Sequence, residues 1–259
     1  MWRERLMPLA EMKKLLRYQP PDRWLSAAEL QRLSELSSAD RRLQWLGGRW
    51  LAKQVLTSLM GERGPAFSDL HIESRDGLDR PARPRVWLRG RMQPWHLTIS
   101  HSANGLYVVA SCEPHCSLGA DVMDAVPLDP ALAGFWFSDQ ERAWCRRIGQ
   151  TWAESIIWSL KESWYKAAGA RVPFAPRCLD IMQLTPIARA RVTDFATQEN
   201  AVWTIRGLDC WIVCRRAPGM LSTLVCLQRG VSRSAVEDRH DSIAAAVCEG
   251  WKNEERGRV

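Results

Sequence analysis

Charged residues at helical spacing make residues 152–168 the most informative stretch of the chain. The apolar residues here recur on one helical face, Glu162 and Lys166 fall on the opposite face, and Lys161 lies at the boundary. A Glu–Lys pair at this spacing can simply be a surface ion pair. Trp158 stands beside these charges, however, which indicates that protein or ligand covers the polar face. A carboxylate and two ammonium groups in a covered cleft suit a metal-bound phosphate.

A single carboxylate interrupts the apolar stretch 118–123. Asp121 lies between Ala120 and Val122 in a segment typical of a strand. Burying a carboxylate is costly unless it is paired with a cation or bound to a metal. Asp121 is therefore either a partner of a positive charge or a residue on the solvent face of its strand.

Polar side chains also follow the predicted strand 96–100. Ser100, His101 and Ser102 stand where this strand runs into a turn. Hydroxyl and imidazole donors on a turn suit a phosphate, whereas the alternative is a turn with an exposed histidine. This motif is informative only together with the other two.

Regular elements must position these residues. Helices are predicted over 26–36, 39–60, 138–148 and 152–168, two of which open on the capping boxes Ser26/Glu29 and Ser138/Glu141. The stretch 75–91, rich in Arg, Pro and Gly, predicts a basic loop, and 126–137 an irregular segment. The predicted strands cover 96–100, 106–111, 118–123, 179–181, 202–205, 210–214 and 221–227. This order predicts an α+β fold, with a first half over 1–112, a second half over 113–228 and a tail over 229–259.

Composition limits the class of protein. The 259 residues include 46% hydrophobic and 25% charged residues, and 36 Lys and Arg against 29 Asp and Glu give a net charge of +7. This mixture is globular, and the positive balance favours an anionic partner. No apolar run approaches the ~20 residues that cross a bilayer, and charges interrupt the first 16 residues, so neither a membrane span nor a signal peptide is predicted. We expect a cytoplasmic protein.

The eight cysteines are scattered and lie mostly in apolar runs, so we expect reduced thiols that act as small hydrophobic residues. The C-x₃-C spacings Cys112/Cys116, with His115, and Cys210/Cys214 raise the alternative of a zinc site. Zinc sites more often use C-x₂-C, which argues against that alternative.

The four stretches TISHS (98–102), LGADVM (118–123), FSDQE (137–141) and WSLKESWYKAAG (158–169) resemble, in order and spacing, the motifs of the Sfp-type 4′-phosphopantetheinyl transferases. The resemblance extends over about residues 41–174, because RRLQWLGGRWLAK also looks like the basic N-terminal helix of that family. The last motif is specific, and the four in order are a stronger signal than any one alone.

The resemblance implies transfer of phosphopantetheine from coenzyme A (CoA) to a serine of an apo acyl or peptidyl carrier protein, with release of 3′,5′-ADP. It also implies two similar α+β halves in a pseudo-two-fold arrangement, with the cofactor in the cleft between them. The matching positions give catalytic roles to Asp121, Glu162 and Lys166. Asp121 and Glu162 would hold Mg²⁺, and Glu162 would also accept the serine proton, directly or through a metal-bound water.

Further roles follow from the same resemblance. Lys161 and Lys166 would neutralise phosphate charge, Ser100 and His101 would contact the cofactor phosphates, and Glu141 would be a supporting acid near the metal. Cofactor contacts are also expected from arginines in the basic segments: Arg41, Arg42, Arg49 and Arg80. The alternative for each arginine is a solvated surface position. Positive charge would in addition speed the encounter with an acidic carrier protein.

One position departs from the family pattern. Met123 stands where the family often has a second strand acid, and a thioether is a poor Mg²⁺ ligand. Some members resemble the sequence at this position, so activity remains compatible with it. Water or Ser102 could complete the site, whereas Asp124 has the wrong strand parity.

Two other functions are alternatives to the transferase. The chain could be a non-catalytic relative that binds CoA or a carrier protein, with turnover lost through Met123. A nucleic-acid-binding protein is suggested only by the net charge and the arginine-rich segment, and the chain lacks a basic platform interleaved with aromatics. We therefore expect no nucleic-acid partner, no membrane partner, and a monomer.

Overall fold

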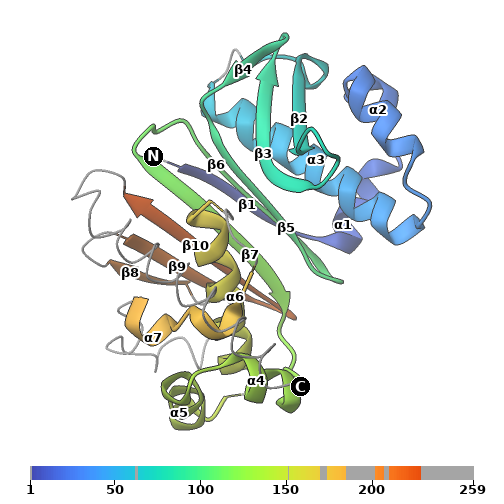
Figure 1. Cartoon of the computed structure of the whole chain (residues 1–259). Coiled ribbons are helices and arrows are strands. Elements are labelled where there is room, and N and C mark those ends of the chain that lie inside the picture. Colours follow the sequence, from blue (N-terminus) through green and yellow to red (C-terminus); the bar gives the residue numbers. More distant parts are fainter. Residues whose placement is uncertain are drawn as a thin grey trace, which may run out of the picture.

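The computed structural model describes residues 2–61, 64–150, 152–169, 174–184, 202–206 and 210–228. Three antiparallel sheets carry the helices on their outer faces, and two of the sheets face each other in the middle of the molecule (Figure 1). The α+β class expected from the sequence is therefore confirmed. The predicted tail 229–259 lies outside the described residues.

The first sheet has the strand order β1-β6-β5, and helix α3 packs across it. Gly47 of α3 permits this close approach, because a Cβ at this position would collide with Leu106 of β6 and Met12 of α1. The strand at the N-terminus was not predicted from the sequence, although its side chains alternate in burial. The elements of this part are β1 (Trp2–Pro8), α1 (Leu9–Leu16), η1 (Pro21–Arg23), α2 (Ala27–Ser34), α3 (Ala39–Leu59), β5 (His96–His101) and β6 (Gly105–Ser111).

The prediction of a basic loop over residues 75–91 is wrong, because these residues lie largely in a small sheet with the strand order β2-β3-β4. Prolines are tolerated in the middle strand for a local reason. Pro84 lies where β2 shifts register between Glu73 and Arg75, and β4 pairs only with Val86–Leu88, so its missing N–H interrupts no ladder. The elements are η2 (Phe67–Asp69), β2 (Leu70–Arg75), β3 (Pro81–Leu88) and β4 (Arg91–Gln93).

The second central sheet has the order β7-β10-β9-β8, and helix α6 packs on β7 and β10. Gly119 of β7 is required there, because a Cβ would overlap the carbonyl oxygen of Ser163 and the backbone nitrogen of Ala167. The elements are β7 (Cys116–Asp124), α4 (Pro130–Trp136), α5 (Asp139–Ile148), α6 (Trp152–Ala167), η3 (Pro176–Cys178), α7 (Ile181–Leu184), β8 (Val202–Arg206), β9 (Cys210–Ala217) and β10 (Met220–Gln228).

Three further expectations need correction in this part. The predicted strand 179–181 is replaced by η3 and α7, and part of the segment 126–137 forms α4. Cys116 and Cys226, on the paired strands β7 and β10, form a disulfide across 6.2 Å between their Cα atoms, so these two are not reduced thiols. The described cysteines, histidines and acids contain no metal-binding cluster of three or more, which leaves the zinc alternative without support there.

The two central sheets are joined by an apolar layer and by hydroxyl groups. Tyr107 and Val109 of β6 pack in one buried cluster with Leu118, Ala120 and other residues of the second sheet. Across β5 and β7, the hydroxyl of Thr98 accepts the N–H of Ala120 at 3.2 Å. The hydroxyl of Ser100 accepts the N–H of Val122 at 3.3 Å. Thr98 and Ser100, two positions apart on β5, thus form hydrogen bonds with the backbone of β7, the strand that carries Asp121.

A similar ion pair is buried in each half of the fold. Both capping boxes form, and their glutamates bind a lysine of the following long helix: Glu29 with Lys53 of α3 at 2.7 Å, and Glu141 with Lys161 of α6 at 2.8 Å. Each lysine also donates to carbonyl oxygens of the segment that follows the long helix. Both pairs are fully buried, so we call them the N-terminal and C-terminal buried pairs.

In the described part of the chain, no helix is both long enough and apolar enough to cross a membrane.

Candidate active site

The acidic cleft lies where the end of β7 meets the polar face of α6. It has a volume of about 550 Å³. Asp121, Glu162 and Lys166 meet in it: Nζ of Lys166 lies 2.8 Å from Oδ1 of Asp121 and 3.2 Å from Oε2 of Glu162. Two carboxylates far apart in the sequence therefore share one ammonium group. The lining residues are Ile99, Ser100, His101, Ser102, Asp121, Val122, Met123, Asp124, Val126, Trp158, Glu162 and Lys166.

Local structure explains why these three side chains meet. Glu162 and Lys166 are one helical turn apart on α6, so both face the same direction. The close approach of α6 to Gly119 brings that face over the end of β7. Trp158, one turn before Glu162, lines the same cleft, as expected of an aromatic side chain that covers a polar face.

Ser100 positions Asp121 rather than pointing a free hydroxyl at a ligand. Its Oγ donates to Oδ1 of Asp121 at 2.7 Å and accepts the N–H of Val122. Asp121 is only 5% exposed. A buried carboxylate needs such partners, because an unpaired charge in the interior is strongly disfavoured. Ser100 lines the acidic cleft with its hydroxyl bonded to the acid, and its contact with a cofactor phosphate stays a prediction.

The electrostatics of the cleft follow from burial and from the two neighbouring carboxylates. Burial, and then the charge of Asp121, raise the pKa of Glu162 above its ordinary value. Burial alone would lower the pKa of Lys166, but the attraction of Asp121 and Glu162 raises it overall. Burial lowers the pKa of His101, and the nearby charge of Lys166 lowers it further. The cleft thus favours the charged form of Lys166, and the charge of Lys166 disfavours protonation of His101, whose side chain is exposed.

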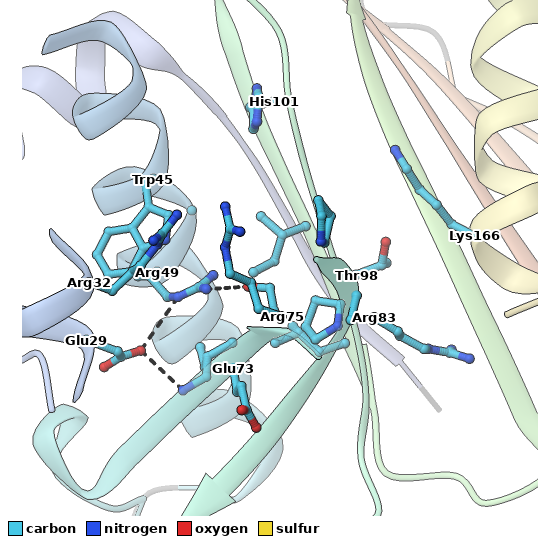
Figure 2. Close-up of a pocket in the computed structure, with 18 of the residues that line it drawn as sticks. Glu29, Arg32, Trp45, Arg49, Glu73, Arg75, Arg83, Thr98, His101 and Lys166 are labelled. Atoms are coloured by element: carbon cyan, nitrogen blue, oxygen red, sulfur yellow. Dashed lines mark hydrogen bonds and ion pairs between the residues drawn. The ribbon is translucent and has the colours of Figure 1, made fainter. Parts of the chain in front are cut away.

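The donor cavity, as we call a second and larger pocket, adjoins the acidic cleft. It measures about 1050 Å³ and shares Ile99, His101 and Lys166 with the cleft. Its walls come from α2 and α3 on one side, from β2, β3 and β5 at its base, and from α6 on the other side (Figure 2). The cationic residues that line it are Arg32, Arg41, Arg49, Arg75, Arg83 and Lys166. A long anionic molecule could therefore lie along the cavity with one end at the carboxylates.

Residues 117–213 match the family model of the 4′-phosphopantetheinyl transferase superfamily. The matched segment contains Asp121, Glu141, Glu162 and Lys166, and it is the superfamily that the four sequence motifs resemble. No curated protein matches the chain.

Two solved structures are similar to part of the chain. One is the holo-ACP-synthase from Plasmodium yoelii, 16% identical, with a TM-score of 0.33, covering 42% of this chain and 90% of that chain. The other is the holo-[acyl-carrier-protein] synthase from Neisseria meningitidis, 18% identical, with a TM-score of 0.33, covering 42% of this chain and 96% of that chain.

Lys161 and Glu141 are brought together away from the cleft. Lys161 is 0% exposed, and its Nζ binds Glu141 and the carbonyl oxygens of Pro176 and Leu179 at 2.6–2.8 Å. Glu141 also accepts the N–H of Ile181 at 2.8 Å. Since neither side chain lines the acidic cleft or the donor cavity, they stabilise the fold, and the expected contacts with phosphate and metal are corrected.

The structure divides the four predicted arginines. Arg41 and Arg49 line the donor cavity, as expected of cofactor-binding residues. Arg42 instead donates to the carbonyl oxygens of Leu33 and Leu36 at the end of α2, both at 3.3 Å. Arg80 is exposed and paired with Asp76 at 2.7 Å. Arg42 and Arg80 do not line the donor cavity as the structure has it, and their contact with a cofactor stays a prediction.

Met123 lines the acidic cleft, but the neighbouring candidates for a third ligand are already bonded. Ser102 donates to Oδ1 of Asp124 at 2.7 Å, and its Oγ accepts the N–H groups of Asn104 and Gly105. Both side chains thus stabilise the turn between β5 and β6. Among the residues that line the cleft, Asp121 and Glu162 are the carboxylates not committed to that turn.

Several cavity residues were missed by sequence reasoning. Trp45, Arg75 and Arg83 line the donor cavity and lie in the basic stretches 41–53 and 75–91, but they were not among the residues expected to contact the cofactor, and Arg32 lies outside these stretches. For Trp45 a signal existed, since it lies one turn from Arg41 and from Arg49 on α3. Arg83 belongs to the basic segment 75–91, but the sequence predicts a loop there, so it does not predict that β3 directs this side chain towards Ser117 and Leu118 of β7 at 3.2 and 3.3 Å.

Proposed function

We propose that the protein transfers the 4′-phosphopantetheine group of CoA to a serine of an apo acyl or peptidyl carrier protein in a Mg²⁺-dependent reaction. The observation that carries the proposal is the shared contact of Asp121 and Glu162 with Lys166 at the end of a cavity rich in arginine. The match of residues 117–213 to the superfamily supports it independently of this geometry.

The donor set of the cleft fits Mg²⁺. This ion prefers one or two carboxylates together with phosphate oxygens and water. Asp121 and Glu162 lie close enough to share one cation, and the raised pKa of Glu162 reflects burial and the neighbouring negative charge. Ser102 and Asp124 are bonded to each other in the turn between β5 and β6. Asp121 and Glu162 would therefore be the protein ligands of the Mg²⁺ ion. When bound, Mg²⁺ would stabilise negative charge on the pyrophosphate of CoA.

The side chains of the cleft account for the remaining steps. Lys166 lines both the cleft and the donor cavity, so its ammonium can bind the phosphate oxygens. The serine hydroxyl oxygen attacks the phosphorus of the phosphopantetheine group, and the bond to the bridging oxygen breaks. 3′,5′-ADP leaves with that electron pair. Glu162 is the candidate to accept the serine proton, directly or through a water, because its carboxylate lies in the cleft beside Lys166 and Asp121.

A mass-spectrometric assay tests the proposal. The protein is incubated with CoA, Mg²⁺ and several apo carrier proteins from fatty-acid, polyketide and nonribosomal-peptide systems. The expected result is a phosphopantetheine-sized mass gain on at least one carrier, which is lost when the metal is chelated. No gain on any carrier, together with no binding of CoA, would contradict the proposal.

Binding of CoA without transfer would instead support the non-catalytic alternative, for which Met123 is the structural reason. Replacing Met123→Glu distinguishes the two functions. A large gain from negligible activity supports lost turnover, whereas little change means that the existing carboxylates suffice.

A further inference from the structure

The distal end of the donor cavity, which we define by Arg32, Trp45, Arg49 and Arg75, lies away from the carboxylates. Figure 2 shows these side chains on the side of α2, α3 and β2, opposite Lys166. The lining residues of α3 recur every three or four positions, so a single face of this helix is turned to the cavity.

Arg49 is a buried cation with incomplete partners. It is only 6% exposed, yet it lines the cavity. One terminal nitrogen donates to Ser74, whereas its Nε lies 3.7 Å from Glu29 and has no hydrogen-bond partner among the described residues. Glu29 is bound more closely by Lys53, at 2.7 Å. Two cations thus share one carboxylate, and the distal end retains positive charge that an anionic ligand would neutralise.

Trp45 lies directly against this cation. The guanidinium carbon of Arg49 is 4.9 Å from the centroid of the Trp45 ring, within the range of a cation–π contact. Because Ser74 and Glu29 hold Arg49, the contact restricts the orientation of the indole ring before any ligand binds. Trp45 is the only tryptophan among the described residues that line the donor cavity.

We propose that Trp45 is the specificity-determining residue for the nucleotide base of the donor: its indole ring stacks on the adenine ring, with Arg49 supporting it. The inference deepens the proposed function and rests on it. An aromatic ring among cations fits a molecule that carries both a flat base and phosphate groups. The pantetheine arm has no ring to stack, so the base is the part of the donor that matches this end.

The position of Trp45 places it in the same cavity as the residues near the carboxylates. The cavity runs continuously from Trp45 to Lys166, which it shares with the acidic cleft. With the base at Trp45, the donor's phosphate would lie near Arg32 and Arg75, which line this end of the cavity and are paired with Glu35 and Asp79, and the pyrophosphate would extend to Lys166. The reacting phosphorus then lies beside Asp121 and Glu162.

Calorimetric binding of 3′,5′-ADP and of uridine 3′,5′-bisphosphate tests the proposal with the full chain. The two probes carry the same phosphates on different bases, and a purine stacks more strongly than a pyrimidine. Trp45→Ala is expected to weaken 3′,5′-ADP binding by about 5-fold to 150-fold, the range for loss of one base-stacking contact. It should weaken the uridine probe less, so that the preference for adenine decreases. Trp45→Phe should retain most of the affinity.

Trp95→Ala is the matched control, because Trp95 packs against the same apolar core but does not line the cavity. It should leave both affinities and their ratio unchanged. Unchanged 3′,5′-ADP binding in Trp45→Ala, or an equal loss in Trp95→Ala, would overturn the role of Trp45 while leaving the proposed function intact. A wild-type chain that binds neither CoA nor 3′,5′-ADP would contradict the proposed function itself.

Discussion

At the scale of single residues, the cleft places two acids around one ammonium group and supports each with a different element. Asp121 is held by Ser100 of β5, and Glu162 by its position on α6. Lys166 is the charge that both acids share. Replacing one of these side chains should therefore affect the chemistry more than the fold.

The first prediction concerns Asp121→Asn. Loss of one carboxylate should weaken metal binding and lower transfer to a carrier protein by at least about 100-fold, because charge in the transition state is no longer stabilised. Asp124→Asn is the matched control, since Asp124 lines the same cleft but is bonded to Ser102 and Asn104. Mn²⁺ binding followed by electron paramagnetic resonance separates the two variants. An equal loss of metal binding in both would contradict the assignment.

The second prediction concerns Arg80, which the sequence assigned to the cofactor. Hydrogen bonds from Arg80 lower the pKa of Asp76 from 3.8 to about 2. Because folding lowers the pKa of Asp76, the ion pair stabilises the folded state at pH values above 3.8. This stabilisation is lost as the pH falls towards 2. Arg80→Gln should return the Asp76 pKa towards 3.8 in an NMR titration and change CoA affinity by less than about threefold. A large loss of CoA affinity would instead place Arg80 on the cofactor.

At the scale of elements, the two buried pairs connect the long helices α3 and α6 to the segments packed against them. Glu141 and Lys161 join the start of α5, the middle of α6 and the segment after η3. Glu29 and Lys53 do the same for α2, α3 and the segment around η2. Burial lowers the pKa of both lysines, which the paired glutamates oppose.

Lys161→Met should therefore destabilise the protein rather than weaken CoA binding. Removing one partner of a buried pair leaves an uncompensated charge and costs about 3–5 kcal/mol. The double variant Lys161→Met, Glu141→Gln should recover part of this loss in urea unfolding. Lys53→Met is the matched control and should show a similar loss. A stable Lys161→Met protein with weakened CoA binding would return Lys161 to the cofactor site.

Gly119→Ala tests the contact between β7 and α6. The added Cβ meets the backbone of Ser163 and Ala167, which has little freedom to move, so a loss of about 1–3 kcal/mol in unfolding free energy is expected. Gly134→Ala is the control in α4, where the Cβ would enter open space and raise helix propensity. Thermal melts of the two variants should shift in opposite directions. A wild-type melting temperature for Gly119→Ala would contradict the close contact.

The elements predicted well from the sequence are those whose signals are local. Ser26/Glu29 and Ser138/Glu141 mark helix starts, and both capping boxes are present. The elements that were predicted incorrectly depend on strand pairing between segments far apart in the sequence. Pro84 lies in a strand because the register shift of β2 leaves its position unpaired, Pro81 is the first residue of that strand, and β1 is a strand because β6 pairs with it. The same holds for the site. The motifs predict Asp121 and Glu162, but they do not predict the contact of Arg83 with β7 or the buried pair of Lys161 and Glu141.

At the scale of the whole molecule, the acidic cleft and the donor cavity take residues from each central sheet with its helices, and we call these two parts the halves. Ser100 and His101 come from the first central sheet, whereas Asp121 and Lys166 come from β7 and α6. The halves are joined by the apolar cluster between the sheets, by Arg83, and by Glu4, which binds both Tyr107 and Arg215. Neither half alone contains a complete site.

A chain that ends at His115 should therefore fail to fold into a stable monomer. It would expose the face of β6 on which Tyr107 and Val109 are buried, and apolar patches of this kind promote association. Size-exclusion chromatography and circular dichroism of the fragment, with and without co-expressed residues 116–259, provide the measurement. A folded monomeric fragment would show that the halves are independent domains.

The buried pairs have one further consequence. Lys53 and Lys161 anchor the long helices without lining the cavity, so the residues of α3 that do line it, apart from Arg49 beside Glu29, contribute less to the stability of the fold. Donor preference can therefore diverge by surface substitutions along α3 while the scaffold persists unchanged. Redesign towards altered nucleotide donors should begin on that helix face and leave Lys53 and Lys161 untouched.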